Sequence, residues 1–182
     1  MMRTNKKKGE YHMLLETERL IITEFTKDMA RVVHENSLDE DNRRFVPDEV
    51  FETEEEAAEV IEFLMGQYEG SDGPFVYPVI AKEGSTNLGY VQMAPLDDGA
   101  WEIGYHIAKK YTGIGYATEA VKAFLPFMTE RIGISEVYGI CLSENIASVH
   151  VLKKCGFDVL FEGTGDYQGE KREIFKSVWK QG

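Results

Sequence analysis

Hydrophobic residues recur along the chain with two periods, and these periods predict where its strands and helices lie. The β-favouring segment 19–25 predicts a first strand. Residues 28–38 have a moderately helical pattern. A clearer helix is expected after Thr53, because Glu56 follows three residues later as in a capping box. The apolar face of this helix contains Ala57, Ile61, Leu64 and Tyr68.

From Phe75 onward the pattern changes to the alternation that is typical of strands. We expect strands over 75–81, 88–93 and 100–108, separated by polar turns. Because short polar turns join neighbouring antiparallel strands, these three strands should form a meander. The third strand alternates most regularly. One face is predicted to hold Trp101, Ile103, Tyr105 and Ile107, and the other face Glu102, Gly104 and His106.

A glycine-rich turn follows the third strand of the meander, and helical spacing then begins. Apolar positions recur every three to four residues, which predicts a helix of about four turns that starts near Ile114 or Gly115. Pro126 lies inside this helix and has no backbone N–H. We therefore expect a kink or an early end near residues 122–127.

The last third of the chain predicts a strand over 136–142, a helix from Asn145 to Cys155, and two final strands over 157–161 and 172–179. Asn145 is suited to cap the helix. The final strands are expected to flank a loop that holds Gly163, Gly165 and Gly169. This order of elements predicts a fold of the α/β (α+β mixed) class, with a central, mixed, mostly antiparallel sheet and helices on both faces.

Length and composition fit one globular domain. The chain has 182 residues, 43% hydrophobic and 29% charged, which argues against disorder and against a disulfide scaffold. We assign residues 14–182 to a single domain and residues 1–13 to a mobile head. The sequence has neither a membrane-length apolar run nor the apolar core of a secretory signal, so a cytoplasmic location is expected. Cys141 and Cys155 lack zinc-site spacing, and we expect them to be buried and unpaired, with no metal site.

Negative charge is concentrated in one part of the chain. The net charge is -12, and residues 35–62 hold 12 acidic and 2 basic side chains, whereas residues 101–182 hold 10 of each. Such a surface repels phosphate backbones, which argues against nucleic-acid binding. It attracts a cationic partner or substrate. A solvated acidic helix face that steers nothing accounts for the pattern equally well.

The most informative segment is the turn at residues 110–117, between a strand and a helix. Gly113 and Gly115 let backbone N–H groups approach a ligand, and the helix N-terminus adds unpaired donors, a combination that favours phosphate. The P-loop pattern is absent, and Thr118 stands where a Rossmann fingerprint has a third glycine or alanine. A turn that only joins a strand to a helix is the structural alternative.

The same segment resembles the acetyl-CoA signature of the GNAT acetyltransferase superfamily, Gln/Arg-x-x-Gly-x-Gly/Ala. Gly113 and Gly115 match it, and Lys110 replaces the usual Gln or Arg. The longer run from Trp101 to Ala120 looks like the RimJ/RimL branch, and the resemblance covers roughly residues 15–180. A second block supports this branch and consists of Asn145–Ser148, Val151–Phe157 and Glu162–Gly163.

This resemblance implies a GNAT fold and acetyl transfer from acetyl-CoA, the co-substrate, to a primary amine by direct attack in a ternary complex. The amine would belong to a protein N-terminus or to a cationic small molecule. Residues before about 75 would line the acceptor side, where the acidic excess lies. A backbone N–H near Ile107 would stabilise the oxyanion. The residues implied to bind acetyl-CoA are Ile107, Ala108, Lys110, Gly113, Ile114, Gly115, Tyr116, Ala117, Thr118 and Asn145.

Two side chains are implied to be catalytic. Because an aliphatic amine is mostly protonated at neutral pH, a base must deprotonate it, and Glu102 occupies the position of the base in some family members. A surface carboxylate paired with a lysine is the alternative role. His106 lies on the same strand face about 13 Å away, too far for a dyad. Ser148 matches the residue that supplies a proton to the CoA thiolate in RimL-like members, with helix packing as its alternative role. Weaker candidates are His34, His150 and Glu162.

Two other functions stay open from the sequence. A non-catalytic CoA-binding or interaction protein would keep the phosphate-binding turn without turnover. A nucleotide-dependent oxidoreductase would bind NAD. Neither accounts for the second block around Asn145 and Ser148. The C-terminal strand that ends at Trp179 is expected to be exposed and to offer a contact for a homodimer.

Overall fold

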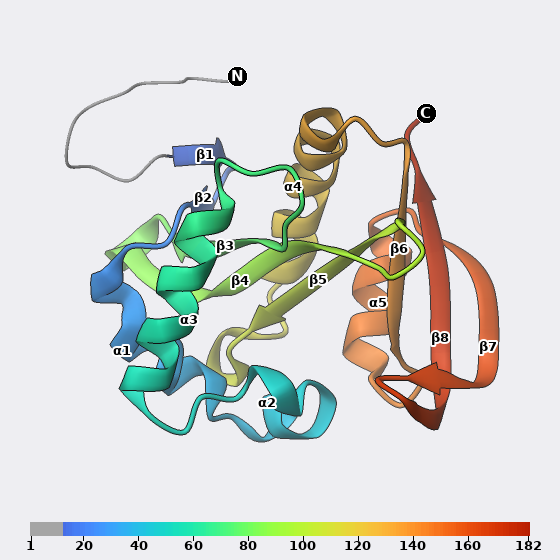
Figure 1. The fold of residues 1–182 in the computed structure, drawn as a ribbon, viewed down its shortest axis with the longest axis horizontal. Coiled ribbons are helices and arrows are strands. Elements are labelled where there is room, and N and C mark those ends of the chain that lie inside the picture. The colour runs from blue at the N-terminus through green and yellow to red at the C-terminus, as the bar shows by residue number, and fades with distance from the viewer. Residues whose placement is uncertain (1–12) are drawn as a thin grey trace.

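An eight-stranded sheet runs through the computed structural model, which describes residues 13–182 (Figure 1). The strand order is β1-β2-β3-β4-β5-β6-β8-β7, and only β5 and β6 are parallel neighbours among the described strands. The strands are β1 (Met13–Glu16), β2 (Leu20–Thr23), β3 (Phe75–Ala81), β4 (Thr86–Pro95), β5 (Trp101–Ile107), β6 (Glu136–Leu142), β7 (Asp158–Tyr167) and β8 (Glu170–Lys180). Residues 1–12, part of the head predicted from the sequence, lie outside the described residues.

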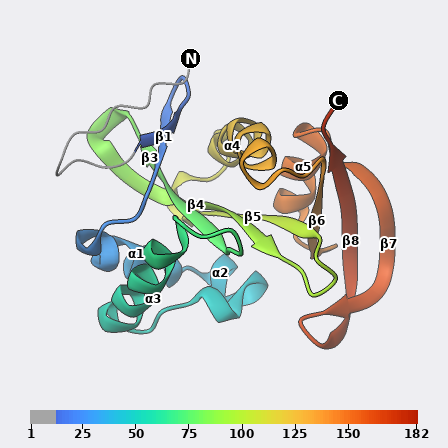
Figure 2. The same cartoon turned by 45° about the horizontal axis from the view of Figure 1, so that its top comes forward.

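Helices cover both faces of the sheet, as predicted (Figure 2). One face carries three helices from the first half of the chain, namely α1 (Ala30–Ser37), α2 (Glu40–Phe45) and α3 (Glu54–Gln67). The other face carries α4 (Tyr116–Ile132) and α5 (Ile146–Lys154). The mixed, mostly antiparallel sheet is therefore confirmed. Within the described part of the chain, no helix combines the length and the apolar character that crossing a bilayer requires.

Side-chain caps fix the helix ends where the sequence predicts them. The Thr53 hydroxyl accepts a hydrogen bond from the N–H of Glu56 (3.1 Å) at the start of α3. The Glu56 carboxylate accepts from the N–H of Glu52 (2.7 Å), so the reciprocal bond of the capping box is displaced by one residue. At the start of α5, Asn145 Oδ1 accepts from the N–H of Ser148 (3.1 Å).

Helix α4 does not end early at Pro126, so the early end, one of the two outcomes expected there, is wrong. The helix runs unbroken for 17 residues. Pro126 lies on its exposed side, where water can bond to the backbone acceptor that the missing N–H leaves free. The proline is therefore tolerated because it faces solvent. On the buried side, the Thr129 hydroxyl donates to the carbonyl of Leu125 (3.0 Å).

The predicted glycine loop between the last two strands is also wrong. Strands β7 and β8 form one long hairpin, and Gly163 and Gly165 lie inside β7. A Cβ at Gly165 would lie 2.5 Å from Ile174 Cδ1, so this glycine permits close packing within the sheet. Strand β8 lies between β6 and β7, so the edge strand is β7. The expectation that the strand ending at Trp179 is exposed is therefore wrong.

Two short elements, β1 and α2, are not predicted by the sequence pattern. Helix α2 has six residues and no apolar periodicity, and it begins where Asp39 accepts from the N–H of Asn42 (2.8 Å). Strand β1 has four residues, too few to show an alternation. Both elements are held mainly by contacts with other parts of the chain.

The parallel junction between β5 and β6 opens the sheet. These strands pair at Glu102 and Tyr138, whereas β6 pairs with β8 along its whole length. Beyond the Glu102–Tyr138 pair, β5 therefore diverges from β6 toward its C-terminal end, as Figure 1 shows. The separation leaves the end of β5, the turn after it and the starts of α4 and α5 around one wedge.

Candidate active site

A cavity of about 520 Å³ occupies this wedge. Its walls come from α2 and the residue after it, the end of β5, the following turn, the first turn of α4, and α5. We call it the cofactor cleft. Seven of the ten predicted cofactor-binding residues line it, namely Ile107, Gly113, Gly115, Tyr116, Ala117, Thr118 and Asn145.

The other three predicted cofactor-binding residues lie outside this lining. Ala108 is buried, and its N–H donates to the carbonyl of Leu88 (2.8 Å). The exposed Lys110 places its ammonium 5.0 Å from the centroid of the Tyr111 ring. Ile114 is 57% exposed. The backbone of the turn, rather than these side chains, forms the wall of the cleft.

The glycine turn presents unpaired N–H groups to the cofactor cleft. Gly113 and Gly115 have φ values of 84° and 89°, which only glycine adopts without strain. Apart from the two chain neighbours, no heavy atom of the described residues lies within 4 Å of a Cβ built on Gly113, so this position is open. The carbonyl of Gly115 receives its helical bond from the N–H of Glu119, so the three preceding N–H groups of α4 have no acceptor within the helix. Together with the helix dipole, these donors suit a phosphate group.

Arg19 and Glu119 fasten this turn to the start of β2. Arg19 Nη1 donates to the carbonyl of Ile114 (2.9 Å), and its guanidinium carbon lies 4.6 Å from the Tyr116 ring centroid. The Glu119 carboxylate accepts from Arg19 Nε (2.6 Å) and from the Thr17 hydroxyl (2.5 Å). Burial raises the pKa of Glu119, but these hydrogen bonds outweigh it, and the net pKa is lowered. The sequence pattern contains no signal for this clamp, because its partners lie about a hundred positions apart.

The backbone N–H of Ile107 points into the wedge. The N–H of Ala108 bonds to Leu88 across the β4–β5 ladder, so Ala108 and Leu88 form a hydrogen-bonded pair. The neighbouring pair, Ile107 and Gly89, is therefore a non-hydrogen-bonded pair. The N–H of Ile107 then points away from β4, toward the side where β6 has diverged. It is a donor in the position that the sequence analysis expected for an oxyanion.

Tyr105 and Ser148 meet across the wedge. Tyr105 Oη lies 2.9 Å from Ser148 Oγ and donates to the carbonyl of Ser148 (3.0 Å). Burial raises the pKa of Tyr105 well above its ordinary value, so the phenol stays neutral and can donate. Asn145 bonds to the Ser148 N–H and so serves as the predicted cap. Sequence reasoning placed Tyr105 on an apolar strand face and missed this contact.

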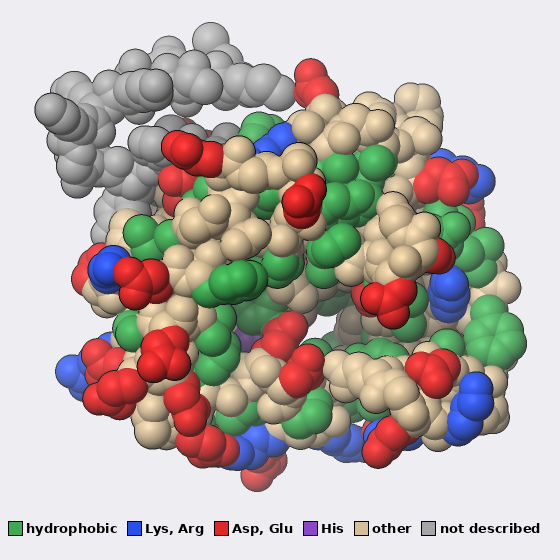
Figure 3. Space-filling model, in the orientation of Figure 1, with side chains coloured by type: hydrophobic (Ala, Val, Ile, Leu, Met, Phe, Trp, Pro, Cys, Tyr) green, Lys and Arg blue, Asp and Glu red, His purple; other side chains and the backbone are tan. Residues whose placement is uncertain are grey.

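A second cavity, of about 540 Å³, adjoins the cofactor cleft and is strongly acidic. We call it the acceptor cleft. The two cavities share Phe45, Val46, Tyr105, Asn145 and Ser148. Figure 3 shows acidic side chains around the hollow at the lower centre of the molecule. No lysine or arginine is among the described residues that line this cleft, whereas its carboxylates are Asp48, Glu49, Asp97, Glu102 and Asp166.

Two of these carboxyl groups titrate near neutral pH. Burial raises the pKa of Glu102 to about 7, against the opposing effects of the Ile140 N–H and the Lys176 charge. Burial also raises the pKa of Glu49 to about 7, with a smaller contribution from the charge of Asp48. Glu49 Oε1 accepts from Gln92 Nε2 (3.3 Å). Glu102 was predicted from the sequence, whereas Glu49, which lies in the 3-10 turn Pro47–Glu49 after α2, was not.

His106 is engaged elsewhere. Its Nε2 lies 3.2 Å from Asp39 Oδ2, which also accepts from the N–H of Lys109 (3.0 Å). Although burial raises the pKa of Asp39, the hydrogen bonds from His106 and from backbone N–H groups lower it to about 2. His34 Nδ1 lies 2.8 Å from the carbonyl of Phe51, so this side chain braces α1.

Neither cysteine is suited to act as a nucleophile. Both are free and buried, as predicted. Burial raises the pKa of each thiol to about 11, so almost no reactive thiolate is present at neutral pH. Cys155 Sγ lies 3.7 Å from the carbonyl of Thr118, at the base of α4. Their role is in packing.

The opened sheet, with a glycine turn at the start of α4, agrees with what the comparisons with known proteins show, which is the fold of an acyltransferase. The chain belongs to the GNAT acetyltransferase family, because the family model described as "Acetyltransferase (GNAT) domain" matches residues 19–158. The curated relative YnaD of Bacillus subtilis, described as an uncharacterized N-acetyltransferase, is 30% identical over 145 residues. That match covers 79% of this chain and 82% of YnaD.

Solved structures show the same fold. A GNAT-family acetyltransferase from Bacillus anthracis has a TM-score of 0.77 at 24% identity, over 94% of this chain and 98% of that chain. RimL, described as a ribosomal L7/L12 alpha-N-protein acetyltransferase in complex with coenzyme A, has a TM-score of 0.76 at 15% identity, over 90% and 95% of the two chains. RimL is thus among the proteins that share this fold, as the resemblance to the RimJ/RimL branch implied.

Proposed function

We propose that the protein transfers the acetyl group of acetyl-CoA to a cationic primary amine by direct attack in a ternary complex. The observation that carries this proposal is the meeting of two cavities at Tyr105, Asn145 and Ser148. One cavity starts at a phosphate-binding turn, and the other is lined by carboxylates. A donor and an acceptor that entered from the two sides would meet at the diverging end of β5.

The residues of the cofactor cleft fit acetyl-CoA. The N–H groups of Gly113 through Thr118 would hold its pyrophosphate. The described residues leave the space beside Gly113 Cα open, so a phosphate could approach the backbone closely there. When bound, acetyl-CoA supplies an activated acyl group as a thioester. RimL, which shares this fold, was solved in complex with coenzyme A, and this supports the same occupant here.

Glu102 is the proposed general base. The acceptor amine is mostly protonated at neutral pH, since alkyl ammonium groups have pKa values of about 10. With a pKa of about 7, Glu102 is partly ionised at neutral pH and can accept this proton. It lines the acceptor cleft and lies two strand positions before Gly104 on the same face. The alternative role, a surface carboxylate paired with lysine, fits less well because burial is the main influence on its pKa.

The other two groups act on the thioester. The Ile107 N–H would stabilise the oxyanion that forms when the amine attacks the carbonyl carbon. The C–S bond then breaks, and the thiolate takes a proton. Ser148 Oγ, hydrogen-bonded to the neutral Tyr105 phenol, would donate that proton or a hydrogen bond.

The acceptor cleft favours a cation, although only part of the acidic segment faces it. Asp48 and Glu49 line the cleft. Other acidic residues of the segment form surface ion pairs, which are Glu35 with Arg31, Asp41 with Lys109, Glu52 with Arg43, and Glu62 with Lys27. These ion-paired residues therefore fit a solvated acidic surface that steers nothing. The carboxylates of the cleft fit the attraction of a cationic substrate.

A calorimetric titration with acetyl-CoA, with NAD as the control ligand, tests the cofactor part of the proposal. We expect saturable binding of acetyl-CoA and none of NAD. Binding of NAD alone would favour the oxidoreductase alternative and would contradict the proposal.

A further inference from the structure

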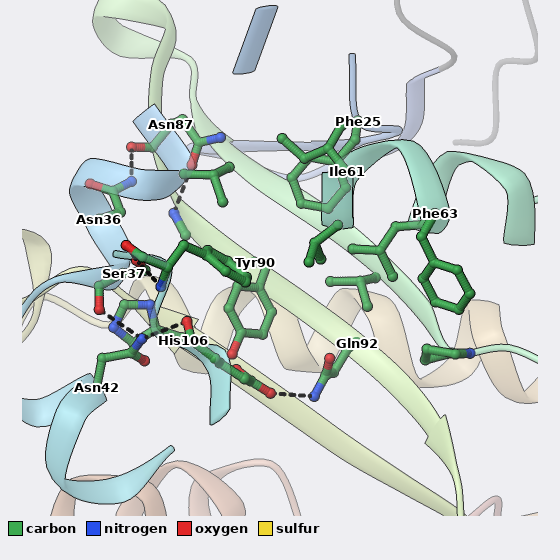
Figure 4. A pocket seen from close by; sticks show the side chains of 18 of the residues that line it. Phe25, Asn36, Ser37, Asn42, Ile61, Phe63, Asn87, Tyr90, Gln92 and His106 are labelled. Atoms are coloured by element: carbon green, nitrogen blue, oxygen red, sulfur yellow. Dashed lines mark hydrogen bonds between the residues drawn. The ribbon is translucent and has the colours of Figure 1, made fainter. Parts of the chain in front are cut away.

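We infer that the acceptor amine carries one compact apolar group, of a size up to an aromatic ring, and that this group binds in a separate pocket beside the acceptor cleft. This inference rests on the proposed function and narrows its substrate class. The pocket lies between helices α1 and α3 and the strands β3 and β4, and has a volume of about 340 Å³ (Figure 4).

The walls of this pocket are apolar on the side of α3. Figure 4 shows Phe25, Ile61 and Phe63 on one side of Tyr90, with Asn36, Asn42, Asn87 and His106 on the opposite side. Phe63 is 56% exposed, so this side reaches the molecular surface. A void with such walls would gain contacts if an apolar group entered it. A second ammonium group that packed against this apolar side would instead lose its hydration.

Unpaired polar atoms surround the same pocket. Among the described residues, five buried side-chain polar atoms have no hydrogen-bond partner, and four of them belong to residues that line it. They are Asn36 Oδ1, Asn42 Oδ1, Glu49 Oε2 and Asn87 Nδ2. The three amide side chains are each at least nine-tenths buried. Buried polar atoms without partners are costly. The three asparagines lie on the wall opposite the apolar side, so water would satisfy these atoms there while the apolar group packs against α3.

The pocket adjoins the acceptor cleft. Asp48, Glu49, Tyr90 and Gln92 line both cavities. The Glu49 carboxylate stands at this junction, with one oxygen bonded to Gln92 and the other unpartnered. A ligand that entered the pocket past Glu49 would keep its amine in the acceptor cleft, where Glu102 and Ser148 lie. The fitting chemistry is a primary amine joined through a short chain to an apolar group.

This chemistry occurs both in small arylalkylamines and at peptide N-termini with a bulky apolar first residue. The test measures kcat/KM by thiol release from acetyl-CoA for 2-phenylethylamine, propylamine and 1,4-diaminobutane. Two peptides, Phe-Ala-Ala-amide and Ala-Ala-Ala-amide, form the second arm. We expect a kcat/KM about 10-fold or more higher for 2-phenylethylamine than for propylamine, or for Phe-Ala-Ala-amide than for Ala-Ala-Ala-amide. A preference in one arm alone identifies the source of the amine.

A variant that fills the pocket supplies the control. Val60 lines the pocket from α3, whereas Met65 lies on the same helix outside its lining. Val60→Phe should bring the kcat/KM values of the apolar and small amines within about 2-fold of each other. Met65→Phe should preserve the difference in kcat/KM. Equal kcat/KM for the apolar and small members of both arms in the parent protein would overturn the inference, as would a higher value for 1,4-diaminobutane.

Binding of 2-phenylethanol, a neutral and unreactive analogue, separates this inference from the proposed function. We expect saturable calorimetric binding to the CoA-loaded parent protein and its loss in Val60→Phe, with folding of the variant checked by thermal unfolding. If no amine is acetylated but 2-phenylethanol binds, the proposed function fails and the pocket assignment stands. If amines are acetylated without apolar preference and 2-phenylethanol does not bind, only the pocket assignment fails. If Val60→Phe does not fold, the two measurements on the parent protein decide.

Discussion

Glu102 and Glu49 are carboxyl groups of one cleft with the same raised pKa, and the mechanism assigns the base to Glu102. Because a base must be ionised, kcat/KM should rise with pH through about 7. Glu102→Gln should lower kcat about 10²–10⁴-fold and abolish this rise. Glu49→Gln, the same substitution in the same cleft, should retain the rise. The pH–rate profiles of both variants provide the measurement, and the reverse result would make Glu49 the base.

Glu49 should also make stability depend on pH. Its pKa is raised from 4.5 to about 7, so the folded state holds a proton that the unfolded state has already lost. Its favourable contribution is complete below pH 4.5 and is lost as pH rises through about 7. Glu49→Gln should therefore raise the unfolding midpoint relative to the parent protein more at pH 8 than at pH 5. We expect a difference of about 2–4 °C, which corresponds to about 1 kcal/mol. Equal shifts at both pH values would show that Glu49 is not buried as described.

Ser148 should matter for turnover more than for cofactor affinity. Removal of its hydroxyl deletes one of the two hydrogen-bond partners of Tyr105 and the proposed donor to the thiolate. We expect Ser148→Ala to lower kcat about 10-fold or more, with the Kd of acetyl-CoA changed less than about 3-fold. Ser143→Ala is a matched control, because Ser143 lines neither cleft. Steady-state kinetics and calorimetry provide the two values. Parent-level activity in Ser148→Ala would remove this residue from the mechanism.

At the residue scale, sequence reasoning found the groups that lie in local motifs and missed those defined by distant contacts. Gly113 and Asn145 were identified because a turn and a helix cap have signatures within a few positions. Glu49, Tyr105 and Arg19 were missed because their partners are brought to them by the fold. For Tyr105, strand alternation correctly indicated the face but could not show that Ser148 lies opposite.

At the scale of elements, the turn that begins α4 carries the proposed cofactor site. Gly113→Ala introduces a methyl group where φ is 84° and no other atom interferes, so its structural cost is the backbone strain of about 1–2 kcal/mol. Gly133 at the other end of α4 has φ 80°, is equally open and lines none of the described cavities. Gly133→Ala is therefore a matched control for strain.

We expect the two variants to lose similar amounts of stability and to differ in cofactor binding. Gly113→Ala should weaken acetyl-CoA binding about 10-fold or more, because strain at this position displaces the N–H groups that face the cleft. Gly133→Ala should leave the Kd within about 2-fold of the parent value. Thermal unfolding and calorimetry supply both measurements. Equal losses of affinity would mean that the turn binds nothing.

Long periodic segments and capped ends made most elements predictable. Strand β6 and the cap of α5 lie where the sequence placed them, since both have clear local patterns. Pro126 and Gly165 misled the prediction for one reason. By its local preference alone, proline disrupts a helix and glycine disrupts a strand. In the folded protein, however, Pro126 faces solvent and Gly165 packs beside Ile174 of the neighbouring strand. Those surroundings depend on tertiary structure.

At the scale of the whole molecule, the net charge of -12 should affect the two substrates in opposite ways. A cationic amine is attracted to the acidic cleft, whereas the anionic cofactor is repelled by the overall charge. Raising the salt concentration from about 0.05 to 0.5 M should lower kcat/KM for a cationic amine several-fold, because salt screens the attraction. A primary amine that is neutral at pH 7 and only weakly nucleophilic, such as 2,2,2-trifluoroethylamine, is the control. Equal salt dependence of the two amines would show that the cleft steers nothing.

The opening of the sheet between β5 and β6 joins these scales. One parallel pair at Glu102 and Tyr138 separates two antiparallel halves, and the cofactor cleft and acceptor cleft meet where the halves diverge. The sequence order predicted a mixed sheet, but the position of the split depends on pairing between strands far apart in the chain. The strand pairing of the folded protein shows where this split lies.

Thiol release from acetyl-CoA in the presence of a cationic primary amine tests the central claim most directly. The account predicts one thiol released for each acetylated amine, saturation in both substrates, and little release without the amine. Thiol release that does not depend on the amine, or saturable binding of acetyl-CoA with no acetylated product from any primary amine tested, would contradict it.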